Sequence, residues 1–134
     1  MAVNLGVYSG YILPVMDARR QQVYCGLFRA EQGSITRIKE DRAIALAELA
    51  EEIKILQEPI FLVGDGSNLC YNTLLERVPN LILPSAHRMH QRAVGVGLAA
   101  AKMAARGEAP DGALLTPNYL RLSQAERERM EKQK

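Results

Sequence analysis

The sequence is poor in residues that mark several classes of protein. It has no Trp, two Phe, and only two cysteines, Cys25 and Cys70, in 134 residues. So few aromatic side chains argue against a protein that binds single-stranded nucleic acid by stacking bases. Two distant cysteines without a CxxC pattern cannot complete a zinc site. We therefore predict two buried free thiols in a reducing cytoplasm.

Long apolar runs and an excess of one charge are also missing. The longest apolar runs are far shorter than the ~18–20 residues of a membrane-spanning helix, and the start of the chain shows no secretory signal pattern. Lys and Arg number 17 against 15 Asp and Glu, a net charge of +2 that argues against a dedicated nucleic-acid binder. We expect a cytoplasmic protein without membrane contact. Its 48% hydrophobic residues suffice for one folded domain.

The apolar pattern predicts elements in the order β-β-β-α-β-α-β-α. Pro14 predicts either an edge position for the first strand or the start of that strand, because proline cannot donate a hydrogen bond to a neighbouring strand. The order is typical of the ribonuclease-H-like fold, an α/β fold with a mixed sheet that is also the repeating half of actin-like ATPases. The strands are expected near 11–16, 23–28, 34–40, 60–63 and 81–83, and the helices near 46–56, 67–77 and 89–106.

Two turns are candidate anion sites. Asp17 and Arg19 fall between the first two strands, where a carboxylate and a guanidinium suit either ligand binding or a solvated turn with a local ion pair. Gly64, Asp65, Gly66 and Ser67 follow a continuous apolar run and precede a helix, where free backbone N–H groups favour anions. A glycine turn that merely joins strand to helix fits the same pattern. Ser67 or Asn68 is expected to cap the helix.

Histidines and basic residues cluster later in the chain. His87 and His90 have a spacing that could place two imidazoles on one face, but a zinc site needs at least three protein ligands, so we interpret them as surface or capping residues. A basic stripe on the expected last helix could face phosphates or simply be its polar side. The stripe comprises Arg88, Arg92, Lys102 and Arg106.

Three motifs occur in order along the chain. They comprise Pro14, Asp17, Ala18, Arg19, Val23 and Tyr24, then Val63 to Gly66, then Pro117, Tyr119 and Arg121, with Ala125 and Glu126 behind them. These motifs resemble "PvlDARrgeVY", "vGdG" and a terminal "PxYlR…AE", which are the signatures of the TsaB (YeaZ) family of tRNA threonylcarbamoyladenosine biosynthesis proteins. The first motif is the most specific.

The resemblance implies a non-catalytic scaffold. Family members pair with the transferase TsaD and are joined by the ATPase TsaE, in a complex that modifies an adenosine beside the anticodon of tRNAs reading ANN codons. Contact with tRNA is expected to be only indirect. Two alternatives stay open: a glycoprotease-like hydrolase, for which the two histidines are the only candidate metal ligands, and a small tRNA-binding module that uses the basic stripe.

The resemblance covers only the second half of the family pattern, since no "IDTS"-like strand precedes it. We predict that 1–10 is the remnant of a preceding helix, that 11–122 is the ribonuclease-H-like domain, and that 123–134 is a charged tail. Asp17 matches a phosphate-loop position of actin-like folds, but Ala18 and Arg19 replace its glycine. The two candidate turns would then line a vestigial nucleotide cleft without a cofactor. The surface where another half would pack predicts a homodimer.

Overall fold

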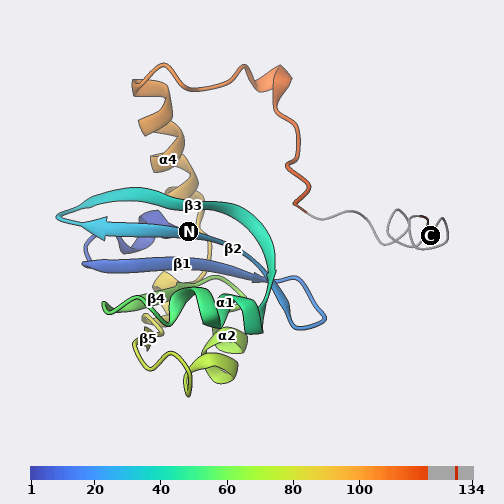
Figure 1. Ribbon diagram of the computed structural model, residues 1–134. Helices are drawn as coiled ribbons and strands as arrows, with labels where there is room; N and C mark the ends of the chain where they lie inside the picture. The colour runs from blue at the N-terminus through green and yellow to red at the C-terminus, as the bar shows by residue number, and fades with distance from the viewer. Residues whose placement is uncertain (121–128, 130–134) are drawn as a thin grey trace.

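A computed structural model describes residues 1–120 and 129. Its centre is a five-stranded mixed sheet in the order β3-β2-β1-β4-β5 (Figure 1). Strands β1, β2 and β3 form an antiparallel meander, whereas β4 runs parallel to β1 and β5 parallel to β4. The ribonuclease-H-like fold predicted from the sequence is therefore confirmed. The strands are β1 (Gly10–Asp17), β2 (Gln22–Glu31), β3 (Ser34–Ala45), β4 (Ile60–Val63) and β5 (Leu81–Ile82).

The helices alternate with the later strands. Two short 3₁₀ helices, labelled η, lie near the two ends of the described chain. The helices are η1 (Ala2–Leu5), α1 (Leu46–Ile53), α2 (Ser67–Leu74), α3 (Ala86–Met89), α4 (Ala93–Ala105) and η2 (Gly112–Leu114).

Strand β1 lies inside the sheet and Pro14 lies within β1 rather than at its start, so the expectation that Pro14 marks an edge strand or a strand start is wrong. Pro14 pairs with Val63 of β4. On the other side the ladder pairs Ile12 with Phe28 and Val15 with Cys25, and it is interrupted between them. Proline is tolerated in a central strand here because it falls where the hydrogen-bonded ladder to β2 is broken.

The main core lies between one face of the sheet and helices α1 and α2. Leu49 and Ile53 of α1 pack with Leu13 and Leu62, and all four are fully buried. These α1 positions recur at helical spacing, whereas Leu13 and Leu62 belong to the alternating set of their strands that faces this side. The continuous apolar run of β4 is explained by burial of every one of its residues.

The other face of the sheet is covered by the N-terminal segment. Leu5 of η1 is fully buried and packs with Ile12, Phe61 and Val63. These strand residues alternate with those that face the main core, as the two-residue period requires. The segment 1–10 is thus part of this layer, and Gly10 already belongs to β1. The domain boundaries at 11, 122 and 123 stay predictions.

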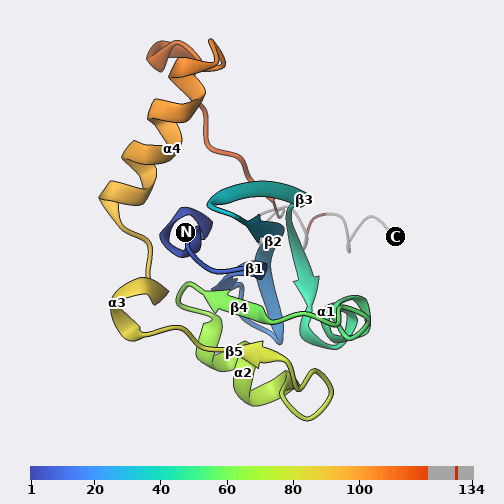
Figure 2. The same ribbon diagram turned by 90° about the vertical axis from the view of Figure 1, so that its left-hand side faces the viewer.

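The expected continuous helix over 89–106 is wrong, because the chain breaks it. Helix α3 ends at Met89, His90 and Arg92 have extended backbone, and α4 begins at Ala93. The break directs α4 away from the sheet, as both views show (Figures 1 and 2). Gly95 is the only buried residue of α4. Residues 90–92 contain neither glycine nor proline, so the sequence offers no local signal for this break.

Candidate functional site

The two turns singled out in the sequence lie side by side. Strands β1 and β4 are parallel neighbours, so the turn after Asp17 and the loop that begins at Gly64 leave the same edge of the sheet. In α/β folds this carboxyl edge is where ligands and partners are commonly bound. The backbone N–H of Gly66 donates to the carbonyl of Val15 at 3.2 Å, which joins the two segments directly.

Close backbone contact explains both glycines of the loop. Gly64 has a φ of +114°, and a Cβ there would collide with the carbonyl oxygen of Val15. A Cβ on Gly66 would lie 3.1 Å from the backbone nitrogen of Asp17. The GDG pattern therefore allows the loop to pack against the end of β1. This packing favours the interpretation of the glycines as structural.

The β1–β2 turn is held in an unusual conformation. Arg19, Arg20 and Gln21 have φ values of 63°, 54° and 58°, a left-handed region that non-glycine residues rarely occupy. The Asp17 carboxylate stabilises the turn, because its Oδ1 accepts the Arg19 N–H at 2.7 Å and its Oδ2 lies 3.4 Å from the guanidinium. Farther along, the Leu46 N–H donates to the Gln21 carbonyl at 2.9 Å, which fixes the turn to the start of α1.

Ser67 does not cap α2 in the expected way. Gly66 takes the N-cap position, and Ser67 is the first helical residue and fully buried. Its hydroxyl donates to the carbonyl of Gly64 at 2.8 Å. Ser67 thus closes the loop on itself, and the prediction that Ser67 or Asn68 caps the helix is wrong.

The α3–α4 junction completes this edge of the sheet. The Gly64 N–H donates to the Met89 carbonyl at 2.6 Å, and Asn4 donates its side-chain amide to the His90 carbonyl at 3.0 Å. A hollow of about 200 Å³ opens here, lined by Asp65 and His90 among others. Helix α2, strand β5 and helix α3 separate these two residues in the sequence. Both histidines are exposed, and only the fold reveals that His90 lies beside the glycine loop.

The structure divides the predicted basic stripe. The Arg88 guanidinium stands 5.6 Å from the ring centroid of Tyr8, and Arg92 donates to the His87 carbonyl at 3.4 Å. Lys102 and Arg106 lie at the far end of α4, where Arg106 pairs with Glu108 at 2.8 Å. The helix break separates Arg88 from α4, so no single helix presents all four cations.

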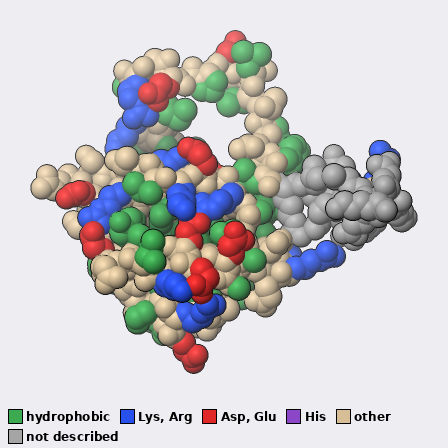
Figure 3. Space-filling model, viewed as in Figure 1, with side chains coloured by type: hydrophobic (Ala, Val, Ile, Leu, Met, Phe, Trp, Pro, Cys, Tyr) green, Lys and Arg blue, Asp and Glu red, His purple; other side chains and the backbone are tan. Residues whose placement is uncertain are grey.

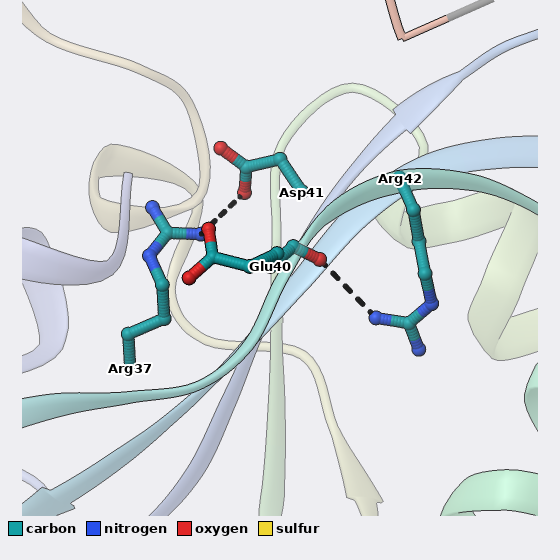
Figure 4. Close-up of polar contacts among 4 residues, drawn as sticks. All are labelled: Arg37, Glu40, Asp41 and Arg42. Carbon is teal, nitrogen blue, oxygen red and sulfur yellow. Dashed lines mark hydrogen bonds and ion pairs between the residues drawn. The ribbon is translucent and has the colours of Figure 1, made fainter.

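A larger hollow of about 760 Å³ lies between α4 and the outer side of β2 and β3. Arg37 and Asp41 line it from β3, and Lys102, Met103 and Arg106 line it from α4. Arg37 donates to Asp41 Oδ1 at 2.9 Å (Figure 4). The Arg37 guanidinium also stands 4.6 Å from the ring centroid of Phe28. The cations that line this hollow are accompanied by carboxylates of nearly equal number.

The C-terminal motif lies in the described chain only in part. Pro117 and Tyr119 are exposed, and Tyr119 retains 84% of its side-chain exposure. Arg121, Ala125, Glu126 and the predicted tail 123–134, apart from Arg129, lie outside the described residues. The roles predicted for this motif and for the turn residues remain predictions.

Burial raises the pKa of both cysteine thiols. Cys25 and Cys70 are free and belong to the main core. Burial raises the pKa of Cys25 to about 11 and that of Cys70 to about 12, because the thiolate would lose its hydration. Across residues 1–120 and 129, no group of three or more His, Cys, Asp or Glu side chains lies close enough to hold a metal ion. None of the helices in this part of the chain is long and apolar enough to span a bilayer.

Comparison with known proteins finds a curated relative. No protein-family model matches the chain. The tRNA threonylcarbamoyladenosine biosynthesis protein TsaB of Bacillus subtilis is 31% identical over 136 aligned positions, which cover 100% of this chain and 57% of that protein. The chain is similar to TsaB along its whole length. It spans little more than half the length of this TsaB relative.

Solved structures agree with the TsaB fold. One is a Pseudomonas aeruginosa protein described as similar to the peptidase YeaZ, with a TM-score of 0.65 at 21% identity over 90% of this chain and 54% of that one. YeaZ from Pseudomonas aeruginosa has a TM-score of 0.56 at 19% identity, over 88% and 54%. These TM-scores show a shared fold, and the first two of the three sequence motifs meet at the carboxyl edge of β1 and β4.

Proposed function

We propose that the chain acts as a non-catalytic scaffold in the biosynthesis of threonylcarbamoyladenosine in tRNA. The observation that carries the proposal is the 31% identity with TsaB along the whole chain. Its proposed partners are a TsaD-like transferase and a TsaE-like ATPase, and contact with tRNA is indirect. The reaction itself belongs to the transferase.

The geometry of the family motif supports a structural role for its residues. The Asp17 carboxylate is occupied by the backbone and guanidinium of Arg19. Gly64 and Gly66 provide room for β1, and the Ser67 hydroxyl is bonded within its own loop. The polar atoms of these residues are bonded within the fold. Their contribution to a reaction would therefore be to position the surface at the carboxyl edge of the sheet.

The exposed apolar side chains of α4 support the scaffold role as well. Val94, Val96 and Leu98 retain 67%, 66% and 51% of their exposure. Apolar side chains gathered on one projecting helix are typical of a surface that binds another protein. Another domain or a partner subunit would bury them.

Reconstitution tests the proposal. The cognate TsaD-like transferase and TsaE-like ATPase are incubated with tRNA, ATP and the threonylcarbamoyl donor, with and without the chain. Mass spectrometry of digested tRNA measures the modified adenosine. We expect the chain to raise the yield and to form no product when it is the only protein. Modification by the chain alone would contradict the non-catalytic role, and an unchanged yield would contradict the scaffold role.

A further inference from the structure

The β1–β2 turn combines strain with exposed cations. Three successive non-glycine residues, Arg19 to Gln21, adopt left-handed backbone. Each such residue has an energetic cost that glycine would avoid, and strain of this kind persists where the surrounding structure fixes it. All three side chains point to solvent, and the Arg19 side chain is 87% exposed. Glycine at these three positions would make the turn more stable, so the side chains are not there to stabilise it.

The turn is rigid as well as exposed. The Asp17 carboxylate holds the Arg19 N–H, the Gln22 N–H donates to the Arg19 carbonyl at 3.1 Å, and the Leu46 N–H holds the Gln21 carbonyl. Within residues 1–120 and 129, the Arg20 side chain has no hydrogen-bond or ion-pair partner. A side chain carried on a backbone that is already held loses little backbone entropy when it binds. Arg20 is thus prepared for a partner outside the chain.

The shape of the turn excludes a small ligand. The turn projects beyond the sheet at the end where α1 begins (Figure 1). Small molecules are bound in concave sites that enclose most of their surface. A convex hairpin tip instead reaches into a macromolecule, where a guanidinium pairs with a carboxylate or a phosphate.

The surrounding charges favour a protein over RNA. Glu48 follows the bonded start of α1, and Asp65 adjoins Gly66 at the base of the turn; both are exposed. Farther along the sheet, Arg42 and Lys39 of β3 are engaged by Glu52 of α1, with Lys39 at 3.1 Å. RNA binding needs several cations that face phosphates together, whereas the exposed guanidiniums of Arg19 and Arg20 among carboxylates suit a complementary protein surface.

We propose that the Arg19–Gln21 turn is a docking element, and that Arg20 inserts into an acidic patch on a protein partner. The inference rests on the proposed function, which supplies that partner as the assembled TsaD-like transferase and TsaE-like ATPase. The left-handed strain at Arg20 is retained because its guanidinium makes this contact, which a glycine at the same position could not make.

A pair of glycine variants tests the inference. Arg20→Gly removes the guanidinium and relieves the left-handed strain. Gln32→Gly is its matched control, because Gln32 is exposed, has a φ of 48° and lies in the β2–β3 turn. We expect both variants to keep a urea midpoint at or above that of the parent chain. Calorimetric titration into the assembled partners should show about tenfold weaker binding for Arg20→Gly alone.

Four other results of these binding measurements would each contradict a different part of the proposal. Equal binding by the parent chain and Arg20→Gly overturns the docking role and leaves the proposed function standing. Loss of affinity for isolated tRNA with unchanged affinity for the proteins overturns the choice of partner. Equal weakening by Gln32→Gly overturns the assignment to the guanidinium. If the parent chain binds neither protein nor their assembly, the proposed partners and the docking role are both refuted.

Discussion

Gly64 is the residue on which the carboxyl edge of the sheet most depends. It combines left-handed backbone with a backbone carbonyl where a Cβ would have to lie. Its N–H also holds the Met89 carbonyl, so a shift of Gly64 would disturb β1 and the α3–α4 junction together. The same residue thus orders three segments that are distant in the sequence.

Gly64→Ala is expected to destabilise the protein by about 3 kcal/mol or more, because strain and a backbone clash add. The control is Gly33→Ala, since Gly33 has a φ of +81° but no atom within 4 Å of the built Cβ. That variant should lose only about 1 kcal/mol. Urea denaturation measures both, and equal losses would contradict the role assigned to the Val15 carbonyl.

The buried thiols predict a fall in stability at alkaline pH. An unfolded thiol loses its proton near its ordinary pKa of 9.0, whereas burial keeps Cys25 protonated to about pH 11 and Cys70 to about 12. Above pH 9 the unfolded state therefore binds fewer protons, and the free energy of unfolding decreases as pH rises. Below pH 9 both states hold these protons, and the contribution is constant.

Urea midpoints between pH 8 and 10.5 measure this effect. The Cys25→Ala, Cys70→Ala double variant should be less stable at pH 8 because it leaves cavities, yet its midpoint should fall less steeply with pH. Identical slopes in the two proteins would show that other groups cause the alkaline loss.

At the scale of elements, η1 is integral to the second core layer. Leu5 is fully buried against Ile12 and Phe61, whereas Val7, two residues later, is 78% exposed. Leu5→Ala is expected to cost about 2–5 kcal/mol through lost burial and a cavity. Val7→Ala should change the free energy of unfolding by less than about 0.5 kcal/mol. Chemical denaturation of the two variants checks this, and a neutral Leu5→Ala would show that the segment 1–10 is dispensable.

The sequence predicts those elements whose signal is local. Strand β4 is a continuous apolar run, and α1 has its apolar residues at helical spacing, so both were expected where they occur. The position of Pro14 was not predictable, because strand order and a ladder interruption depend on the partner strand. The break at His90–Arg92 contains neither glycine nor proline, and contacts with Asn4 and Gly64 fix it.

The candidate site shows the same division. The sequence marked the Asp17 turn and the glycine loop, and the motif order led to the family. It did not show the left-handed backbone of Arg19, Arg20 and Gln21, because such backbone is favoured in glycine and asparagine and is rare in these residues. Nor did it place His90 beside Asp65, since their proximity requires the whole β4–α2–β5–α3 path.

At the scale of the whole molecule, charge and apolar surface are distributed differently. Charged side chains of both signs are interspersed over the face shown in Figure 3. Helix α4, which projects from the sheet (Figures 1 and 2), exposes the apolar side chains of Val94, Val96, Leu98 and Met103. A small net charge does little to oppose association through such a helix. The homodimer expected from the sequence would form through this surface.

Val96→Glu, Leu98→Glu is expected to shift the chain toward monomer, because two carboxylates cannot be buried unpaired. The control Ile55→Glu changes an apolar residue that is 70% exposed but lies away from α4. Light scattering across a concentration series measures the mass. A parent chain that stays monomeric at high concentration, or association unchanged by the double substitution, would contradict a dimer through α4.

The hydrogen bond from the Leu46 amide to the Gln21 carbonyl links two parts of the chain that differ in function. Leu46 begins a core helix, whereas Gln21 ends the exposed turn. The amide proton of Leu46 can exchange with solvent only when this turn opens or the helix start unfolds. Its exchange rate is therefore a built-in reporter of the turn, readable by NMR without any label on the arginines. A bound protein that immobilises the turn should slow exchange of the Leu46 amide proton, although Leu46 itself is buried.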